Sequence, residues 1–415
     1  MDSTLYNSKF LITLLSSSNS KLLKLSYQSI INQLHHYMNY TIVIVVNSLN
    51  TEYYKEVSDT FNELNVEIEI IETQSNGKPG MGHNSLFEIF KNKKQYDYLI
   101  PIDGDDFLYP YALHQLSKII IQHTPDILVL QGNDVLSWYE DAISSTDIFL
   151  NNSFYLIKQD EYPVNKWNFN KDIVNKNPFT SETFITPVRL ILCSRNIFKL
   201  NIIKYYCDSC NVIDDYLFYL HFINIYVKDL LKVYIINSNH IYLYNDLSIL
   251  SVHNTLSLTN DYKYIKKYKG QFNSVIDYFK EDWDVLKLPF ININPPFSDI
   301  YNNYKIYNES IQILNYDKYI QNINTVYCVD FCKNLVVEIY NIFKNNIDTW
   351  LANNNIKKAL ELCLKFIKNN CSDREIYTYI CICGVFINDE KLIYKYINDA
   401  LPYCKNYDCL LKYIK

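Results

Sequence analysis

The amino-acid sequence predicts an α/β protein with a mainly parallel β-sheet covered by helices on both faces, followed by a mostly α-helical C-terminal region. Strand and helix signals alternate through the first 135 residues, which is the order that produces a parallel sheet. The run TIVIVV at 41–46 is apolar at every position, as in a strand that is covered on both faces. After about residue 255 strand signals become rare, and amphipathic helical patterns replace them.

The elements of the first region follow one another at short intervals. Strands are expected at 10–15, 41–46, 66–71, 98–102 and 127–130, and later at 188–193 and within 233–244. Helices are expected at 22–33, 52–64, 85–93, 111–123 and 213–227. In such sheets ligands bind outside the carboxyl ends of the strands.

The length of 415 residues predicts two domains, which we expect at 1–255 and 256–415. The prolines near 287–297 mark the best linker candidate. Pairs of amphipathic helices are expected from about 336, at 356–368, 374–386 and 391–401. Such helices could form a homo-oligomer interface, hold a protein partner or cover a sheet edge.

Composition narrows the class of protein. Hydrophobic residues make up 48% and charged residues 20%, which excludes a largely disordered chain. The net charge of −6 argues against nucleic acid as the main partner, since phosphate contacts need a basic surface. The odd count of 11 cysteines indicates free thiols and a cytoplasmic location. No apolar run reaches the ~18 residues of a membrane span, and no signal peptide is expected.

Glycine is rare, with seven in the chain, and five of these lie between 77 and 132. Glycine is needed where the backbone bends sharply or approaches a ligand closely. The segment NGKPGMGHN at 76–84 precedes an expected helix, where backbone N–H groups could hold a phosphate. A flexible turn with a helix cap would use the same residues.

A second connection carries three carboxylates. The apolar strand at 98–102 leads directly into Asp103, Gly104, Asp105 and Asp106. Like charges this close repel one another unless a cation or a proton intervenes. Oxygen ligands alone favour Mg²⁺ or Mn²⁺, which commonly bridge to substrate phosphates. The sequence therefore predicts a metal and nucleotide site in preference to a solvated acidic turn in which Asp106 caps the next helix.

The stretch YDYLIPIDGDDFLYPYAL resembles the D-x-D-D region of family 2 glycosyltransferases, which have the GT-A fold. The opening LITLLSSSNSKLLKLSYQSIINQ resembles the first strand and helix of that family, and GKPGMGHN resembles its glycine-rich segment ending in A-R-N. IDDY at 213–216 resembles the E-D motif, and YLYN at 242–245 resembles the closing segment. The resemblance covers about 8–255, and the pieces occur in the expected order.

The resemblance implies metal-dependent transfer of a sugar from a nucleotide-sugar, most simply a UDP-sugar, to an acceptor hydroxyl, usually with inversion. It implies that Asp105, together with Asp103 and Asp106, binds Mn²⁺ or Mg²⁺ and that Asp215 is the general base, with Asp214 as the helix cap beside it. The residues that it places around the nucleotide-sugar are Ser16, Ser18, Asn47, Gly77, His83, Asp103 and Asp105. The acceptor, whether glycan, lipid or protein, is not readable from the sequence.

Two departures from the family pattern concern donor recognition. Asn47 stands where an aspartate usually reads the base, and His83 stands where the arginine of A-R-N is expected. These changes leave open a degenerate binding or scaffold protein that acts through its helical tail. A nucleotidyltransferase is a third alternative, although it would usually need a more basic phosphate site. Arg189 and Arg195 could each bind phosphate or pair on the surface.

Overall fold

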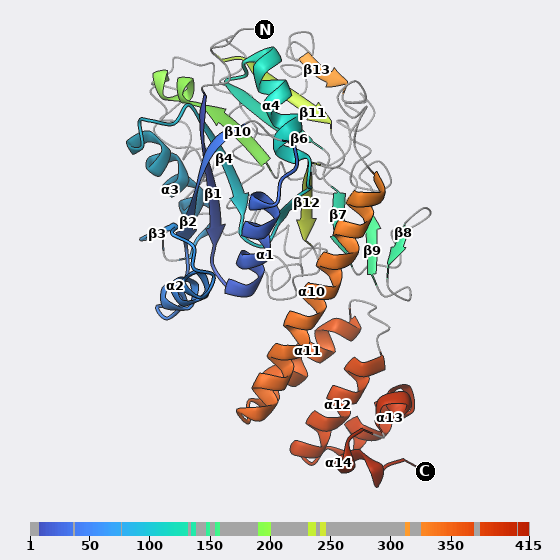
Figure 1. Ribbon diagram of the computed structural model, residues 1–415. Coiled ribbons are helices and arrows are strands. Elements are labelled where there is room, and N and C mark those ends of the chain that lie inside the picture. The colour runs from blue at the N-terminus through green and yellow to red at the C-terminus, as the bar shows by residue number, and fades with distance from the viewer. Residues whose placement is uncertain are drawn as a thin grey trace, which may run out of the picture. The chain divides into compact units, whose positions relative to one another are not determined.

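The structure is a computed structural model (Figure 1). It describes residues 8–35, 38–75, 77–131, 134–137, 147–149, 154–157, 190–200, 231–237, 241–245, 312–315, 325–368, 374–404 and 406–414. These residues divide into two compact units. The first comprises 1–134, 158–244 and 256–328, and the second 135–157, 245–255 and 329–415.

The first unit is built on an eight-stranded sheet of order β13-β11-β6-β10-β4-β1-β2-β3. Its strands are β1 (Lys9–Ser16), β2 (Asn39–Val46), β3 (Glu69–Glu72), β4 (Tyr98–Asp103), β6 (Ile127–Gln131), β10 (Leu190–Ser194), β11 (Val233–Asn237) and β13 (Gln312–Asn315). Strand β10 pairs antiparallel with β4 and β6, and the other pairings between described strands of this sheet are parallel. The predicted, mainly parallel sheet is confirmed.

Helices cover both faces of the sheet. The helices are α1 (Ser20–Ile31), α2 (Tyr53–Glu63), α3 (Pro79–Asn92) and α4 (Ala112–His123). Residues of α1, α2 and α4 share one core with Phe10, Ile12 and Leu14 of β1. Because side chains alternate along a strand, Leu15 points to the opposite face, where it lies beside Gly82 of α3. The covering of both faces explains why β1, β2 and β4 are almost entirely apolar.

The predicted start of α3 is wrong. The helix expected at 85–93 begins six residues earlier, at Pro79, so the glycine-rich segment forms its first turns. Proline suits the first helical position because its fixed φ matches the helix and its missing N–H has no partner there anyway. The helix expected at 213–227 lies outside the described residues.

A short ladder joins two segments far apart in the sequence. Strand β5 (Phe107–Leu108) pairs antiparallel with β12 (Tyr242–Asn245), with Leu108 opposite Tyr242. The short 3-10 helix η4 (Arg195–Lys199) follows β10. The expected one or two strands within 233–244 are therefore two, and they belong to different sheets.

The second unit contains paired helices. They are α10 (Thr325–Ala352), α11 (Ile356–Lys368), α12 (Arg374–Phe386), α13 (Glu390–Cys404) and α14 (Asp408–Leu411). The predicted bounds of α11 and α12 are confirmed to the residue. Strands β7 (Asp134–Ser137) and β8 (Asp147–Phe149) pair antiparallel with β9 (Phe154–Ile157).

Residues 256–328 group with the first unit, because β13 extends its sheet through parallel pairing with β11. The compact units therefore differ from a division at residue 255, which stays a prediction as a domain boundary. None of the helices within the described ranges has the length and apolar character needed to cross a membrane.

Candidate functional site

Polar residues gather where neighbouring parallel strands of the first unit end. Strand β1 ends at Ser16, β2 is followed by Asn47, β3 is followed by Thr73, and β4 ends at Asp103. The ladder runs to this edge, since the Asn47 N–H donates to the Ser16 carbonyl (2.7 Å) and the Thr73 N–H to that of Val46 (2.9 Å). This is the edge at which α/β sheets bind ligands.

The acidic turn after β4 is held against β1. The Gly104 N–H donates to the Leu15 carbonyl (2.7 Å), and the Asp106 N–H closes the turn on the Asp103 carbonyl (3.0 Å). A Cβ at position 104 would lie 2.9 Å from both the Leu15 oxygen and the Cβ of Ser16. Glycine is therefore required at 104 by the close approach of the turn to β1.

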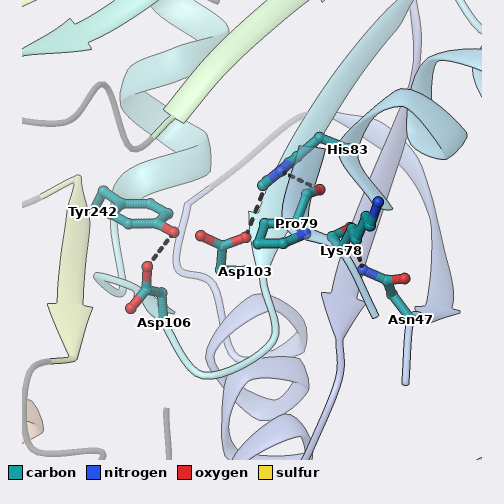
Figure 2. A network of polar contacts seen from close by, with 7 residues as sticks. All are labelled: Asn47, Lys78, Pro79, His83, Asp103, Asp106 and Tyr242. Carbon is teal, nitrogen blue, oxygen red and sulfur yellow. Dashed lines mark hydrogen bonds and ion pairs between the residues drawn. The ribbon is translucent and has the colours of Figure 1, made fainter. Parts of the chain in front are cut away.

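The three carboxylates of the turn do not face the same way. The Asp103 side chain is 33% exposed and Asp105 is half-buried, whereas Asp106 is 1% exposed. The Asp106 carboxylate accepts a 2.6 Å hydrogen bond from the hydroxyl of Tyr242, which is itself buried (Figure 2). Two carboxylates thus remain accessible at the end of β4, and the third is bound inside the protein.

His83 lies on the other side of the turn from Tyr242 (Figure 2). Its Nε2 is 3.3 Å from Oδ1 of Asp103, and its Nδ1 is 3.1 Å from the Pro79 carbonyl. Both ring nitrogens therefore face oxygen atoms. The structure places an imidazole from the N-terminal part of α3 beside the acidic turn.

Asn47 is buried in a hydrogen-bond network and is 3% exposed. Its amide nitrogen donates to the Lys78 carbonyl (3.1 Å), and its oxygen accepts from the Thr73 hydroxyl (3.1 Å). The Thr73 hydroxyl also shares a 3.0 Å hydrogen bond with Ser75. A Cβ at Gly82 would collide with the Asn47 amide. Asn47 therefore holds the start of α3 against β2, and the expectation that it reads a base stays a prediction.

The remaining expected nucleotide contacts occupy different environments. Ser16 is buried, and its hydroxyl shares a 2.6 Å hydrogen bond with that of Tyr53, whereas Ser18 is exposed. Burial, and to a lesser extent the charges of Glu56 and Asp105, raise the pKa of Tyr53, so its hydroxyl stays protonated. Ser18 is available to a ligand, and Ser16 is engaged with α2.

Gly77 stands in the turn that precedes α3. Its φ of +71° is in the left-handed region, and an added Cβ would lie 2.9 Å from Cγ of Leu49. The Lys78 N–H closes this turn on the Ser75 carbonyl (3.2 Å). Gly77 therefore shapes the entry to α3, where backbone N–H groups begin to point out of the helix end.

A comparison with known protein families gives a match for residues 14–162 to the family model "Glycosyl transferase family 2". That range includes the end of β1, the acidic turn and His83. This match assigns residues 14–162, and not the whole chain, to family 2 glycosyltransferases. The resemblance read from the sequence is confirmed over this range, and the GT-A fold that it implied is supported there.

Solved structures that are similar to this chain have low sequence identity to it. TarS 1–349 of S. aureus in complex with UDP is 11% identical, with a TM-score of 0.40, covering 96% of this chain and 92% of that one. The complex of the same protein with UDP-GlcNAc is 13% identical, with the same TM-score and coverages. The inositol-1-phosphate CTP transferase of T. maritima is 11% identical, with a TM-score of 0.33, covering 61% of this chain and 95% of that one. A comparison with curated protein sequences gave no match.

The donor atoms at the acidic turn of the glycosyltransferase domain suit a hard divalent cation. No group of three or more His, Cys, Asp or Glu side chains within the described residues is placed to hold a metal ion alone. Mg²⁺ is usually bound by one or two carboxylates, with water and substrate phosphates completing its ligands. Asp103 and Asp105, which are both partly exposed, fit that arrangement.

The remaining candidate residues are Asp214, Asp215, Arg189 and Arg195. Asp214, Asp215 and Arg189 fall outside the described residues. The Arg195 guanidinium donates to the carbonyls of Phe90 (2.6 Å), Lys93 (2.8 Å) and Tyr96 (2.7 Å). Arg195 thus binds backbone at the C-terminal end of α3, so its phosphate-binding alternative has no support in the structure.

The sequence interpretation missed Tyr53 and Thr73, and it gave Tyr242 no role of its own. Tyrosine occurs 39 times in the chain, so neither Tyr53 nor Tyr242 carried a compositional signal. Thr73 directly follows a strand, and this position at the end of a strand was the only sign in the sequence that it could belong to the site. These residues act through contacts with other elements, which one sequence does not reveal.

Proposed function

We propose that the protein transfers a sugar from a nucleotide-sugar, most simply a UDP-sugar, to an acceptor hydroxyl, with inversion and with a bound divalent metal. The observation that carries the proposal is the pair of partly exposed aspartates, Asp103 and Asp105, at the end of β4 within the range that matches family 2. The choice of uridine and the inverting stereochemistry rest on the family resemblance.

The acidic turn is the proposed donor-diphosphate site. Asp105, with Asp103 beside it, would hold Mn²⁺ or Mg²⁺, which supplies Lewis-acid stabilisation of the departing diphosphate. His83 supports the same region, because its ring lies near the start of α3 and faces Asp103. It is the group in this chain that stands where the family arginine is expected.

The general base of the proposal is Asp215, with Asp214 as the cap of its helix. As the acceptor oxygen forms its bond to the anomeric carbon, the bond to the diphosphate breaks and Asp215 takes the hydroxyl proton. Such a base typically contributes about 10²–10⁴-fold to the rate. This assignment rests on the IDDY resemblance alone.

The strand ends would form the nucleotide side of the site. Ser18 is exposed and could contact the nucleotide directly, and Gly77 lets the loop before α3 turn sharply. Ser16 and Asn47 would support that surface from behind, since their side chains are buried and hydrogen-bonded. A cytoplasmic location and a partner or oligomer contact through the C-terminal helices stay predictions.

The proposal is tested by thermal unfolding of the full chain with Mn²⁺, Mg²⁺ and a panel of nucleotides and nucleotide-sugars. A ligand that binds the native state raises its stability by RT ln(1 + [L]/Kd). We expect a metal-dependent rise in Tm with uridine nucleotides, and release of UDP from the matching UDP-sugar. A folded protein that shows no shift with any nucleotide contradicts the proposal and favours a scaffold role.

Asp215→Asn separates binding from chemistry. It should keep the metal-dependent Tm shift and lose transfer. Asp59→Asn, an identical change on the exposed surface of α2, is the matched control and should retain both. Normal transfer by Asp215→Asn would remove that residue from the base role.

A further inference from the structure

The acidic turn is anchored from two directions. On one side the Gly104 N–H binds the Leu15 carbonyl of β1, and on the other the Asp106 carboxylate binds the Tyr242 hydroxyl of β12. Between these anchors, Asp103 and Asp105 remain partly exposed. The chain on both sides of Asp105 is therefore held by the groups that bind Gly104 and Asp106.

The β12 anchor uses both backbone and side chain. Tyr242 pairs with Leu108 in the β5–β12 ladder, and the Tyr109 N–H donates to the Ile241 carbonyl (3.0 Å). These backbone contacts fix the segment that leaves the turn. The 2.6 Å hydrogen bond from Tyr242 to Asp106 then reaches into the turn itself, across 136 positions of sequence.

Burial gives this one hydrogen bond a large structural effect. Asp106 and Tyr242 are each 1% exposed, so the Asp106 carboxylate has almost no contact with solvent. A buried charge that loses a hydrogen-bond donor is strongly destabilised, and the chain relieves that cost by moving the group toward water. In the turn, such a movement of Asp106 would rotate the neighbouring Asp105.

We propose that Tyr242 is a positioning residue for the metal–diphosphate site and that Asp106 is its buried anchor, not a metal ligand. The inference rests on the proposed function. The Tyr242 hydroxyl keeps Asp106 turned inward, and this leaves the carboxylates of Asp105 and Asp103 directed at the donor side. Figure 2 shows the geometry, with Tyr242 reaching Asp106 from β12 while His83 faces Asp103.

The test compares Tyr242→Phe, Asp106→Asn and the control Tyr98→Phe in the full-length protein. Tyr98 is also a buried tyrosine, but it stands at the opposite end of β4 from the turn. The measurements are Tm, the affinity for Mn²⁺ with UDP, and kcat and KM for the donor with Mg²⁺ and with Mn²⁺.

For Tyr242→Phe we expect kcat with Mg²⁺ to fall by about 10- to 100-fold, the range that a small misplacement of a reacting group produces. The loss with Mn²⁺ should be smaller, because Mg²⁺ demands near-ideal octahedral geometry. If Tyr242 served only the packing of the core, its substitution would lower Tm and leave the ratio of kcat with Mg²⁺ to kcat with Mn²⁺ unchanged. Tyr98→Phe should leave that ratio at its wild-type value.

Asp106→Asn keeps an oxygen that accepts from Tyr242 and removes the carboxylate charge. If Asp106 is the anchor, this variant binds Mn²⁺ with UDP within about threefold of wild type, a change below 1 kcal/mol. Loss of metal binding in this variant would make Asp106 a ligand and overturn the inference. Since Asp106→Asn preserves the hydrogen bond, it tests whether Asp106 is an anchor or a metal ligand even if Tyr242→Phe fails to fold.

The outcomes separate this inference from the proposed function. A wild-type protein that neither binds metal with a nucleotide nor turns over any donor would overturn both. An active wild type, with Tyr242→Phe unchanged in kcat and in metal ratio, would overturn the positioning role alone.

Discussion

The acidic turn of the first unit leaves two of its three reactive side chains partly exposed, whereas the helical pairs of the second unit bury theirs. At the turn one carboxylate, that of Asp106, is buried and hydrogen-bonded, while Asp103 and Asp105 stay accessible. In the helical pairs Cys363 and Cys383 are buried, and burial raises the pKa of both thiols, that of Cys383 to about 12. Buried thiols of this kind are chemically inert. Carboxylates and thiols are both common in this chain, and only those that the fold leaves exposed are candidates for a reactive site.

The largest expected effect comes from Asp105→Asn at the turn. The variant should lose metal-dependent nucleotide binding and lower transfer by at least about 100-fold, because metal stabilisation of the departing diphosphate contributes several kcal/mol. EDTA should have the same effect on the wild type. Calorimetric titration of UDP with and without Mn²⁺ measures the loss, and Asp59→Asn is the control. Unchanged titration would remove Asp105 from the metal site.

Gly82→Ala tests how tightly the first turn of α3 packs on β2. The added methyl meets the Asn47 amide and Leu15, and such overpacking costs about 1–3 kcal/mol of unfolding free energy. That cost should exceed the ~1 kcal/mol by which alanine favours a helix over glycine. Urea denaturation measures the difference.

The matched background for Gly82→Ala is Asn47→Ala, which removes the colliding amide. In that background the glycine substitution should cost less than in the wild type, because the two residues are in contact. Equal costs in both backgrounds would mean that the Asn47 contact does not decide the need for glycine.

Thiol labelling tests whether the cysteines of the helical unit are buried as the structure shows. Cys409 is exposed, whereas Cys363 and Cys383 are buried. A maleimide added to the native protein should label Cys409 well before the two buried thiols, as followed by peptide mass spectrometry, and urea should abolish the difference. Cys409→Ser should transfer sugar at the wild-type rate. Rapid native labelling of Cys363 would show that this core opens.

The smallest effect is expected at the Lys344–Glu375 ion pair between α10 and α12. The two groups are 2.8 Å apart and partly exposed, so the pair should contribute only about 0.2–1 kcal/mol. Lys344→Met should lower the unfolding free energy by no more than this, and high salt should reduce the difference. A loss of several kcal/mol would mean that the pair is much better shielded than its exposure indicates.

The sequence by itself determined the order of elements and the position of the acidic turn. The apolar run of β4 ends in a carboxylate, and the periodicity of α11 and α12 is regular enough to fix their bounds. These features depend on residues close in sequence. The start of α3 was misplaced because glycines usually mark a turn, whereas here Gly82 is demanded by contact with Asn47.

Only the tertiary structure decided which carboxylates face outward and what holds them. Asp103, Asp105 and Asp106 are chemically alike in the sequence, and a tyrosine from β12 distinguishes the third of them. His83 reaches Asp103 because α3 packs beside β4. A hydrogen bond across 136 positions leaves no local pattern, since its energy depends on burial and on the approach of two segments that chain connectivity does not fix.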